Sequence, residues 1–160
     1  MRNFKYTCLA ILVTLMLENN LALANNTPNN FVRPIDGTIT SVFSFGRIHP
    51  IFGNVRPHNG TDIANTDGTP IKASRSGKVS FSGWQNGYGY VVILDHGDSF
   101  TTLYAHQNQQ PLVDVGETIA QGQTIGYVGS TGYATGPHVH FEIRERGALK
   151  DPYNFIPYNA

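Results

Sequence analysis

Short apolar runs alternate with glycine-centred breaks along most of this 160-residue chain. Beyond residue 36 no window shows a 3.6-residue apolar period, and runs rich in Val, Ile, Phe, Tyr and Thr recur instead. The runs are TITSVFSF, TPIKAS, GKVSFSG, YVVILD, SFTTLYAH, QTIGYVG and HVHFEIRE. Turn signals lie between them, including Asn86-Gly87, His96-Gly97-Asp98 and Gly129-Ser130-Thr131-Gly132. The pattern predicts an all-β fold: a small β-sandwich or partly open barrel of antiparallel strands with long groove loops.

The N-terminal segment follows a different pattern. Arg2 and Lys5 give a basic start, an apolar run covers residues 9–17, and Ala22-Leu23-Ala24 is a small-residue cleavage motif. The apolar run is well short of the roughly 20 residues that a membrane-spanning helix needs. This layout is typical of a secretory signal peptide, and an uncleaved single-helix anchor is the alternative.

We therefore predict a signal peptide over residues 1–24, a short flexible leader over residues 25–36 and one folded domain over residues 37–160. Export would place the mature protein in the periplasm or outside the cell, with no membrane anchor after cleavage. A domain of this size is large enough to bury a core of its own, and we expect a monomer.

Charge and cysteine content narrow the range of partners. Cleavage after Ala24 removes Arg2, Lys5 and Glu18, which leaves 9 basic and 10 acidic residues of the 11 of each. That balance offers no basic surface for nucleic acid or for an anionic membrane. Cys8 is removed with the signal peptide, so the mature chain has no thiol and no disulfide.

The motif HVHFE, residues 138–142, places two histidines on a run that otherwise reads as a buried strand. Alternate side chains of a strand share a face, so His138 and His140 would lie about 6–7 Å apart on one side. Burying two imidazoles costs free energy unless each ring nitrogen finds a partner. Either the pair is exposed to solvent, or this face binds something that takes nitrogen ligands.

A second cluster, RPHNGTDIA, places His58 and Asp62 four residues apart. The neighbouring proline disfavours a helix, and in an extended chain the two side chains would lie about 13 Å apart. A turn at Asn59-Gly60 would instead bring imidazole and carboxylate together, unless the segment is merely a solvated turn. With a third histidine the pair would complete a catalytic zinc site that has an open fourth position. Spacing alone leaves open whether His138 or His140 is that ligand.

A third cluster, SFTTLYAH, ends in another histidine. Period-2 alternation places Thr102, Tyr104 and His106 on one strand face, which is either solvent-exposed or part of a site. The sequence has no HExxH motif, so no glutamate is placed as the general base of a zinc peptidase. A histidine, whose pKa lies near neutrality, suits that task.

Taken together, these segments resemble the LytM/lysostaphin family of zinc endopeptidases that cleave peptidoglycan peptides. The resemblance covers roughly residues 40–157, nearly the whole mature chain. It is carried by four motifs in order: FSFGRIHPIFGNVRPHNGTDIA, GTPIKASRSGKVSFSGWQNGYGYVVILDHGDSFTTLYAH, VGETIAQGQTIGYVGSTGYATGPHVHFEI and DPYNFIP.

The resemblance implies one Zn²⁺ per chain, held by His58, Asp62 and His140. It also implies that His106 and His138 flank the metal-bound water, one as general base and the other assisting the oxyanion or the leaving amine. The implied substrate is the peptide cross-link of bacterial peptidoglycan, either a D-alanyl–diaminopimelate bond or a glycine bridge. A non-catalytic wall-binding regulator on the same fold is the alternative function.

Two further expectations concern the carboxylate of Glu142 and the glycine-rich segments of the chain. Glu142 shares the face of His138 and His140, and we interpret it as a surface carboxylate at the strand end, with a hydrogen bond to a ligand ring as the alternative. The glycine-rich segments GWQNGYGY and GSTGYATGP are predicted to form groove walls that let a peptide approach the backbone closely. Candidate substrate contacts on them are Tyr88, Tyr90 and Tyr133.

Overall fold

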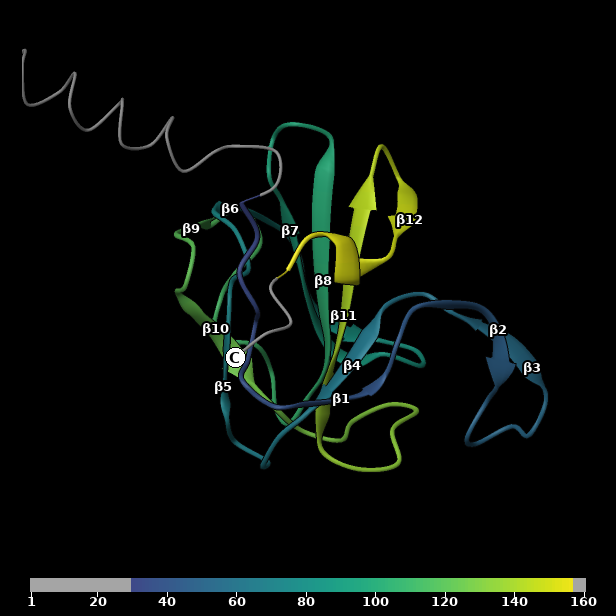
Figure 1. The fold of residues 1–160 in the computed structure, drawn as a ribbon. Coiled ribbons are helices and arrows are strands. Elements are labelled where there is room, and N and C mark those ends of the chain that lie inside the picture. Colours follow the sequence, from purple (N-terminus) through teal and green to yellow (C-terminus); the bar gives the residue numbers. More distant parts are fainter. Residues whose placement is uncertain (1–29, 157–160) are drawn as a thin grey trace, which may run out of the picture. The chain divides into compact units, whose positions relative to one another are not determined.

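The computed structural model describes residues 30–156, and the strands within them build antiparallel sheets (Figure 1). The predicted signal peptide lies outside the described residues. The elements are β1 Thr38–Ser41, β2 Ser44–Ile48, β3 Val55–His58, β4 Thr61–Ala64, β5 Pro70–Lys72, β6 Gly77–Gln85, β7 Gly89–Asp95, β8 Phe100–Gln107, β9 Thr118–Ile119, β10 Thr124–Tyr127, β11 His138–Glu145, β12 Ala148–Lys150 and the 3-10 helix η1 Pro152–Asn154.

One eight-stranded sheet forms the framework. Its strand order is β1-β4-β11-β8-β7-β6-β9, and β12 pairs with β11 off this path. Two short two-stranded sheets, β5–β10 and β2–β3, accompany it, and the β2–β3 hairpin lies beside the β1–β4 end of the large sheet in Figure 1. The prediction of an all-β antiparallel fold is confirmed, and in the described part of the chain the sheets do not close into a barrel.

The side chains of β11 alternate between its two faces, so that one face is apolar and the other polar. Val139, Phe141 and Ile143 are fully buried in the main core, and Ile71 of β5 and Ile125 of β10 belong to the same core. Burying each such apolar side chain contributes roughly 1.5–3 kcal/mol. The opposite face of β11 carries the polar residues of HVHFE. The strand is therefore fixed by its apolar face while the other face remains available for chemistry.

The segment assigned to a flexible leader belongs in part to the core. Phe31 is only 3% exposed, and its ring packs edge-on against the rings of Phe100 and Phe155 at 5.6 and 5.8 Å. Ile35 is likewise buried, at 4%. The compact unit thus begins at Phe31 rather than at residue 37. Polar and proline residues surround these two apolar side chains in the sequence, and that composition is why a flexible leader is expected there.

A buried polar network lies on the core side of β8. The imidazole of His96 contacts the Ser76 carbonyl through Nδ1 at 2.8 Å and the Thr102 hydroxyl through Nε2 at 2.9 Å. The Thr102 hydroxyl is also hydrogen-bonded to the hydroxyl of Tyr104, which in addition accepts from the Ser74 amide at 2.8 Å. Burial lowers the pKa of His96. This histidine is a structural residue whose hydrogen bonds are met within the fold.

The lowered pKa of His96 predicts an acid-sensitive contribution to stability. Above the unfolded pKa of about 6.5 the imidazole is neutral in both states, and below it the unfolded chain binds a proton that the folded chain resists. The free energy of unfolding of metal-free protein should therefore fall as pH drops below about 6.5. In His96→Gln the fall should be smaller, and urea unfolding at pH 7.5 and 5.5 measures both. An equal fall in wild type and variant would contradict this role.

Candidate metal and catalytic site

A tight turn brings His58 and Asp62 together. His58 ends β3, Asp62 lies in β4, and the Nε2 atom of His58 is 3.0 Å from Oδ1 of Asp62. The turn between them passes so close to β11 that a Cβ added to Gly60 would lie 2.2 Å from the Phe141 carbonyl oxygen. Any side chain at this position would collide with backbone, so glycine is required. The prediction that Asn59-Gly60 folds the two side chains onto one point is confirmed.

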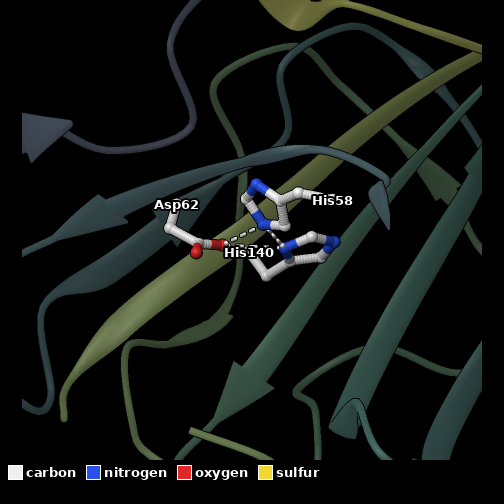
Figure 2. A group of neighbouring side chains, drawn as sticks. All are labelled: His58, Asp62 and His140. Atoms are coloured by element: carbon white, nitrogen blue, oxygen red, sulfur yellow. Dashed lines mark hydrogen bonds and ion pairs between the residues drawn. The ribbon is translucent and has the colours of Figure 1, made fainter. Parts of the chain in front are cut away.

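Strand pairing supplies the third member of the cluster. His140 of β11 lies directly opposite Asp62 of β4, so their side chains project side by side from one face. Nδ1 of His140 is 2.8 Å from Oδ1 of Asp62 and 3.1 Å from Nε2 of His58. Figure 2 shows the three side chains converging. Of the two histidines that spacing leaves open, His140 is the one whose ring joins this cluster.

The outer hydrogen bonds of the two rings fix where their protons lie. Nδ1 of His58 faces the Val42 carbonyl at 2.8 Å and must donate to it, which leaves Nε2 as a bare lone pair. Nε2 of His140 faces Oε1 of Glu142 at 3.1 Å and donates to it, which leaves Nδ1 bare in the neutral ring. Two imidazole lone pairs and one carboxylate oxygen therefore point at one another. That arrangement needs a positive charge between them.

The donor set and its spacing fit zinc. Zinc–ligand bonds are about 2.0–2.1 Å long, so two ligand atoms at a tetrahedral angle lie about 3.3 Å apart. The three ligand atoms of this cluster would need to move apart only slightly to reach that separation.

In the absence of metal, a proton supplies the positive charge between the three ligand atoms. Burial lowers the pKa of His140, but the hydrogen bonds to Asp62 and Glu142 outweigh it and raise the pKa to about 9. Burial raises the pKa of Asp62, yet its bonds to His140 and His58 hold it far below the usual range.

The rings of His106 and His138 lie beside the cluster, and a hydrogen bond from Nδ1 to a backbone carbonyl orients each of them. Nδ1 of His106 donates to the Thr131 carbonyl at 2.7 Å, and Nδ1 of His138 donates to the Gly136 carbonyl at 2.8 Å. Each neutral ring thus keeps an unprotonated Nε2 on its other side. The two ring centroids are 4.7 Å apart, and Nε2 of His138 lies 3.8 Å from Asp62 Oδ1.

The predicted face of His106 is wrong. Strand alternation grouped it with Tyr104, but the Tyr104 ring packs on Phe141 in the core, whereas the His106 ring lies 5.9 Å from that of His140 on the opposite face. The pairing of β7 with β8 shifts register here, and His106 has a φ of 60°. A bulge of this kind reverses the alternation and re-aims one side chain. Holding a non-glycine residue in this conformation costs about 1–2 kcal/mol.

Burial and neighbouring imidazoles keep His106 neutral. Burial is the main cause, and the repulsion of His138 and His140 adds to it, so that the pKa of His106 falls to about 4. At neutral pH its Nε2 is therefore a proton acceptor. The strained backbone and the anchored Nδ1 together hold that acceptor toward the cavity.

Glu142 is not the surface carboxylate that we expected. Its side chain is fully buried, and besides His140 its oxygens accept from the Tyr88 hydroxyl at 2.6 Å and from the Arg144 guanidinium at 2.6 Å. Burial and the adjacent carboxylate raise the pKa of Tyr88 to about 12, so the phenol remains a donor. The sequence could not reveal the contact with Tyr88, because Tyr88 comes from a segment 54 residues away.

A cavity opens directly above the cluster. Both glycine-rich segments contribute to it, the first through Gly87 and Tyr88 and the second through Tyr133 and Thr135. Of the three predicted contact tyrosines, Tyr88 and Tyr133 line the cavity, whereas Tyr90 packs against Trp84 at 5.1 Å.

The β2–β3 hairpin supplies a wall that the sequence did not predict. Arg47 and His49 line the cavity from this hairpin. The register of β2 against β3 shifts between Ser44 and Arg47, and an irregularity of this kind can change the direction of a side chain from the one that simple alternation predicts. No local sequence pattern marks that irregularity, so the contribution of Arg47 becomes visible only in the structure.

Comparison with known proteins agrees with this geometry. The model of peptidase family M23 matches residues 56–152, which include both halves of the cluster. The chain belongs to peptidase family M23. The peptidoglycan DD-endopeptidase ShyC of Vibrio cholerae is 41% identical over 114 residues, which are 71% of this chain and 26% of ShyC. This M23 chain thus matches about a quarter of the length of that relative.

Solved M23 structures have the same fold. A zinc-containing peptidase from Vibrio cholerae superposes with a TM-score of 0.70 at 37% identity, over 76% of this chain and 39% of that one. The catalytic domain of lysostaphin from Staphylococcus simulans gives a TM-score of 0.65 at 34% identity, over 74% of this chain and 91% of that domain. Within residues 30–156 no helix is long and apolar enough to cross a membrane.

The position of Glu142 makes a testable prediction about metal affinity. Glu142→Gln replaces the carboxylate that fixes the tautomer of His140 by a neutral amide, whose oxygen is a weaker acceptor and whose NH2 group donates, and we expect zinc affinity to fall about 10–100-fold. Glu145→Gln is the matched control on the same strand, because Glu145 forms an ion pair with Lys150 at the surface. Competition with a chromophoric chelator measures both affinities. Equal affinities in wild type and Glu142→Gln would contradict the assignment.

Proposed function

We propose that this chain is a zinc-dependent endopeptidase that hydrolyses the peptide cross-links of bacterial peptidoglycan. The observation that carries the proposal is the convergence of two imidazole nitrogens and one carboxylate oxygen at a cavity, with two further carbonyl-anchored histidines beside them. The names of the M23 relatives, a peptidoglycan DD-endopeptidase and a zinc-containing peptidase, support the substrate and the metal.

In this proposal His58, Asp62 and His140 hold one zinc ion. The ion supplies a Lewis acid that brings the pKa of water near 7 and polarises the scissile carbonyl. Three protein ligands leave a fourth position open, as in other catalytic zinc sites. Glu142 and the Val42 carbonyl keep the two imidazoles in the tautomers that ligation requires.

His106 and His138 handle the protons. Because each neutral ring donates through Nδ1 to a backbone carbonyl, its Nε2 can only accept a hydrogen bond at first. Either ring can therefore take the proton of the attacking water. Once protonated, the same Nε2–H can donate to the oxyanion or pass the proton to the leaving amine.

The proposal includes an exported protein, since peptidoglycan lies outside the cytoplasm. The signal peptide predicted over residues 1–24 and a monomeric mature protein are parts of this proposal. The alternative is a non-catalytic wall-binding regulator on the same fold, which would bind peptidoglycan without hydrolysing it.

Two substitutions test the division of labour among the histidines. His140→Ala should lose bound zinc, since it removes one of three protein ligands. His138→Ala should retain close to one zinc per chain but lose turnover about 100-fold or more, because it removes only a proton acceptor. Metal analysis of the purified variants and a cleavage assay report the two properties separately. A fully active, zinc-loaded His140→Ala protein would overturn the ligand assignment.

Digestion of purified sacculi tests the function itself. The zinc-loaded protein should release muropeptide monomers from cross-linked dimers, and a zinc chelator should abolish the release. Mass spectrometry of walls with diaminopimelate cross-links and of walls with glycine bridges identifies the bond. Binding to sacculi without cleavage of either wall would favour the regulator.

A further inference from the structure

Arg47 occupies an unusual position at the cavity. It lies in β2, lines the cavity from the hairpin, and its side chain is 28% exposed. Its Nη2 atom is 3.6 Å from Oδ2 of Asp62, which is longer than a hydrogen bond. Its Nε atom is buried and has no hydrogen-bond partner among the described residues. The guanidinium is thus held beside the proposed metal ligands with an Nε donor that no residue in the described part of the chain uses.

The charge of the cavity points to an anionic ligand. Among the described residues that line it, Asp62 is the one acidic side chain, set against Arg47 and several histidines. Glu142 lies behind His140, fully buried and paired with Arg144, so it does not offset the charge of Arg47. A zinc ion on Asp62 would leave the cavity with a net positive charge. A negative group on the substrate would balance it.

We propose that Arg47 binds a free carboxylate on the amine side of the scissile bond. The inference rests on the proposed peptidase function and names its substrate class: amides whose nitrogen-bearing carbon also carries a carboxylate. The D-alanyl–diaminopimelate cross-link has that carboxylate, and a bond within a glycine bridge does not. Arg47 would then determine which wall the enzyme cleaves.

Covalent geometry makes the contact feasible. In such a substrate the carboxylate carbon lies about 3–4 Å from the reacting carbonyl carbon, because only the amide nitrogen and one carbon separate them. A group bound that close to the zinc ligands falls within reach of the Arg47 side chain, 3.6 Å from Asp62. The planar guanidinium can donate two parallel hydrogen bonds to a carboxylate, a geometry that lysine does not offer.

A purely structural role, in which Arg47 only orients Asp62, predicts different behaviour. Loss of such a role would lower zinc occupancy, or would slow cleavage of every substrate by the same factor. Loss of a carboxylate subsite would affect only substrates that carry the carboxylate. A pair of substrates that differ in this one group separates the two roles.

The experiment uses two synthetic D-alanyl–diaminopimelate cross-linked peptides, one with the free carboxylate next to the scissile nitrogen and one with that carboxylate amidated. Zinc-loaded wild type should cleave the acid with a kcat/KM about tenfold or more above that of the amide. Arg47→Gln should lose that preference through a slower reaction with the acid alone, at unchanged zinc content. Arg47→Lys should recover only part of it.

Arg56→Gln is the matched control, because Arg56 lies opposite Arg47 in the hairpin and stacks on Phe52 at 4.1 Å instead of lining the cavity. It should keep the wild-type preference. Equal cleavage of acid and amide by wild type would overturn the inference while leaving the peptidase intact, and so would an equal slowing of both substrates in Arg47→Gln. If wild type cleaves neither peptide, the proposed hydrolytic function is wrong. Fluorescence anisotropy with the same two peptides then tests whether Arg47 forms a carboxylate subsite. Tighter binding of the acid than of the amide supports the subsite, and equal binding overturns it.

Discussion

Nε2 of His58, Nδ1 of His140 and Oδ1 of Asp62 lie close together, and with both imidazoles neutral and the carboxylate ionised none of them has a proton to donate to the others. The three atoms are separated by 2.8–3.1 Å, and the outer bonds of the two rings leave all three as acceptors. A cation is the one partner that satisfies them together. The rest of the structure serves to hold these acceptors in place against their mutual repulsion.

The framework does this through strand pairing and backbone contacts more than through the chemistry of the site itself. The register of β4 against β11 sets Asp62 opposite His140, and the apolar side chains on the far face of β11 prevent that register from slipping. Backbone carbonyls at Val42, Thr131 and Gly136 then fix three imidazoles by Nδ1. Each anchoring carbonyl comes from a loop, so the loops orient rings that the strands position.

The sequence was sufficient wherever one strong local rule applied. Alternation in HVHFE correctly placed two histidines on one face, and the Asn59-Gly60 turn correctly joined His58 to Asp62. Prediction from the sequence failed where a local backbone irregularity or a contact with a distant residue determined the position of a side chain. The φ of 60° at His106 reverses the face that alternation assigns, and no residue type in SFTTLYAH signals it.

Glu142 illustrates the second kind of failure. Strand alternation places Arg144 on the face of Glu142, but the second partner, the Tyr88 hydroxyl, comes from a segment 54 residues away and does not follow from the pattern of the strand. Arg47 was missed for a similar reason, since it lines the cavity from a two-stranded hairpin whose register shifts. In both cases the charged residue lies near a group that is distant in the sequence, and the local pattern of residues does not reveal such a contact.

X-ray absorption at the zinc edge tests the central claim most directly. The account predicts one zinc per chain with two imidazole nitrogens, one carboxylate oxygen and one further oxygen, all at about 2.0–2.2 Å. Substitution of His106 or His138 should leave the two-imidazole signal unchanged, because neither ring is a ligand. A spectrum with three or four imidazoles, or no zinc retained at neutral pH, would contradict the account.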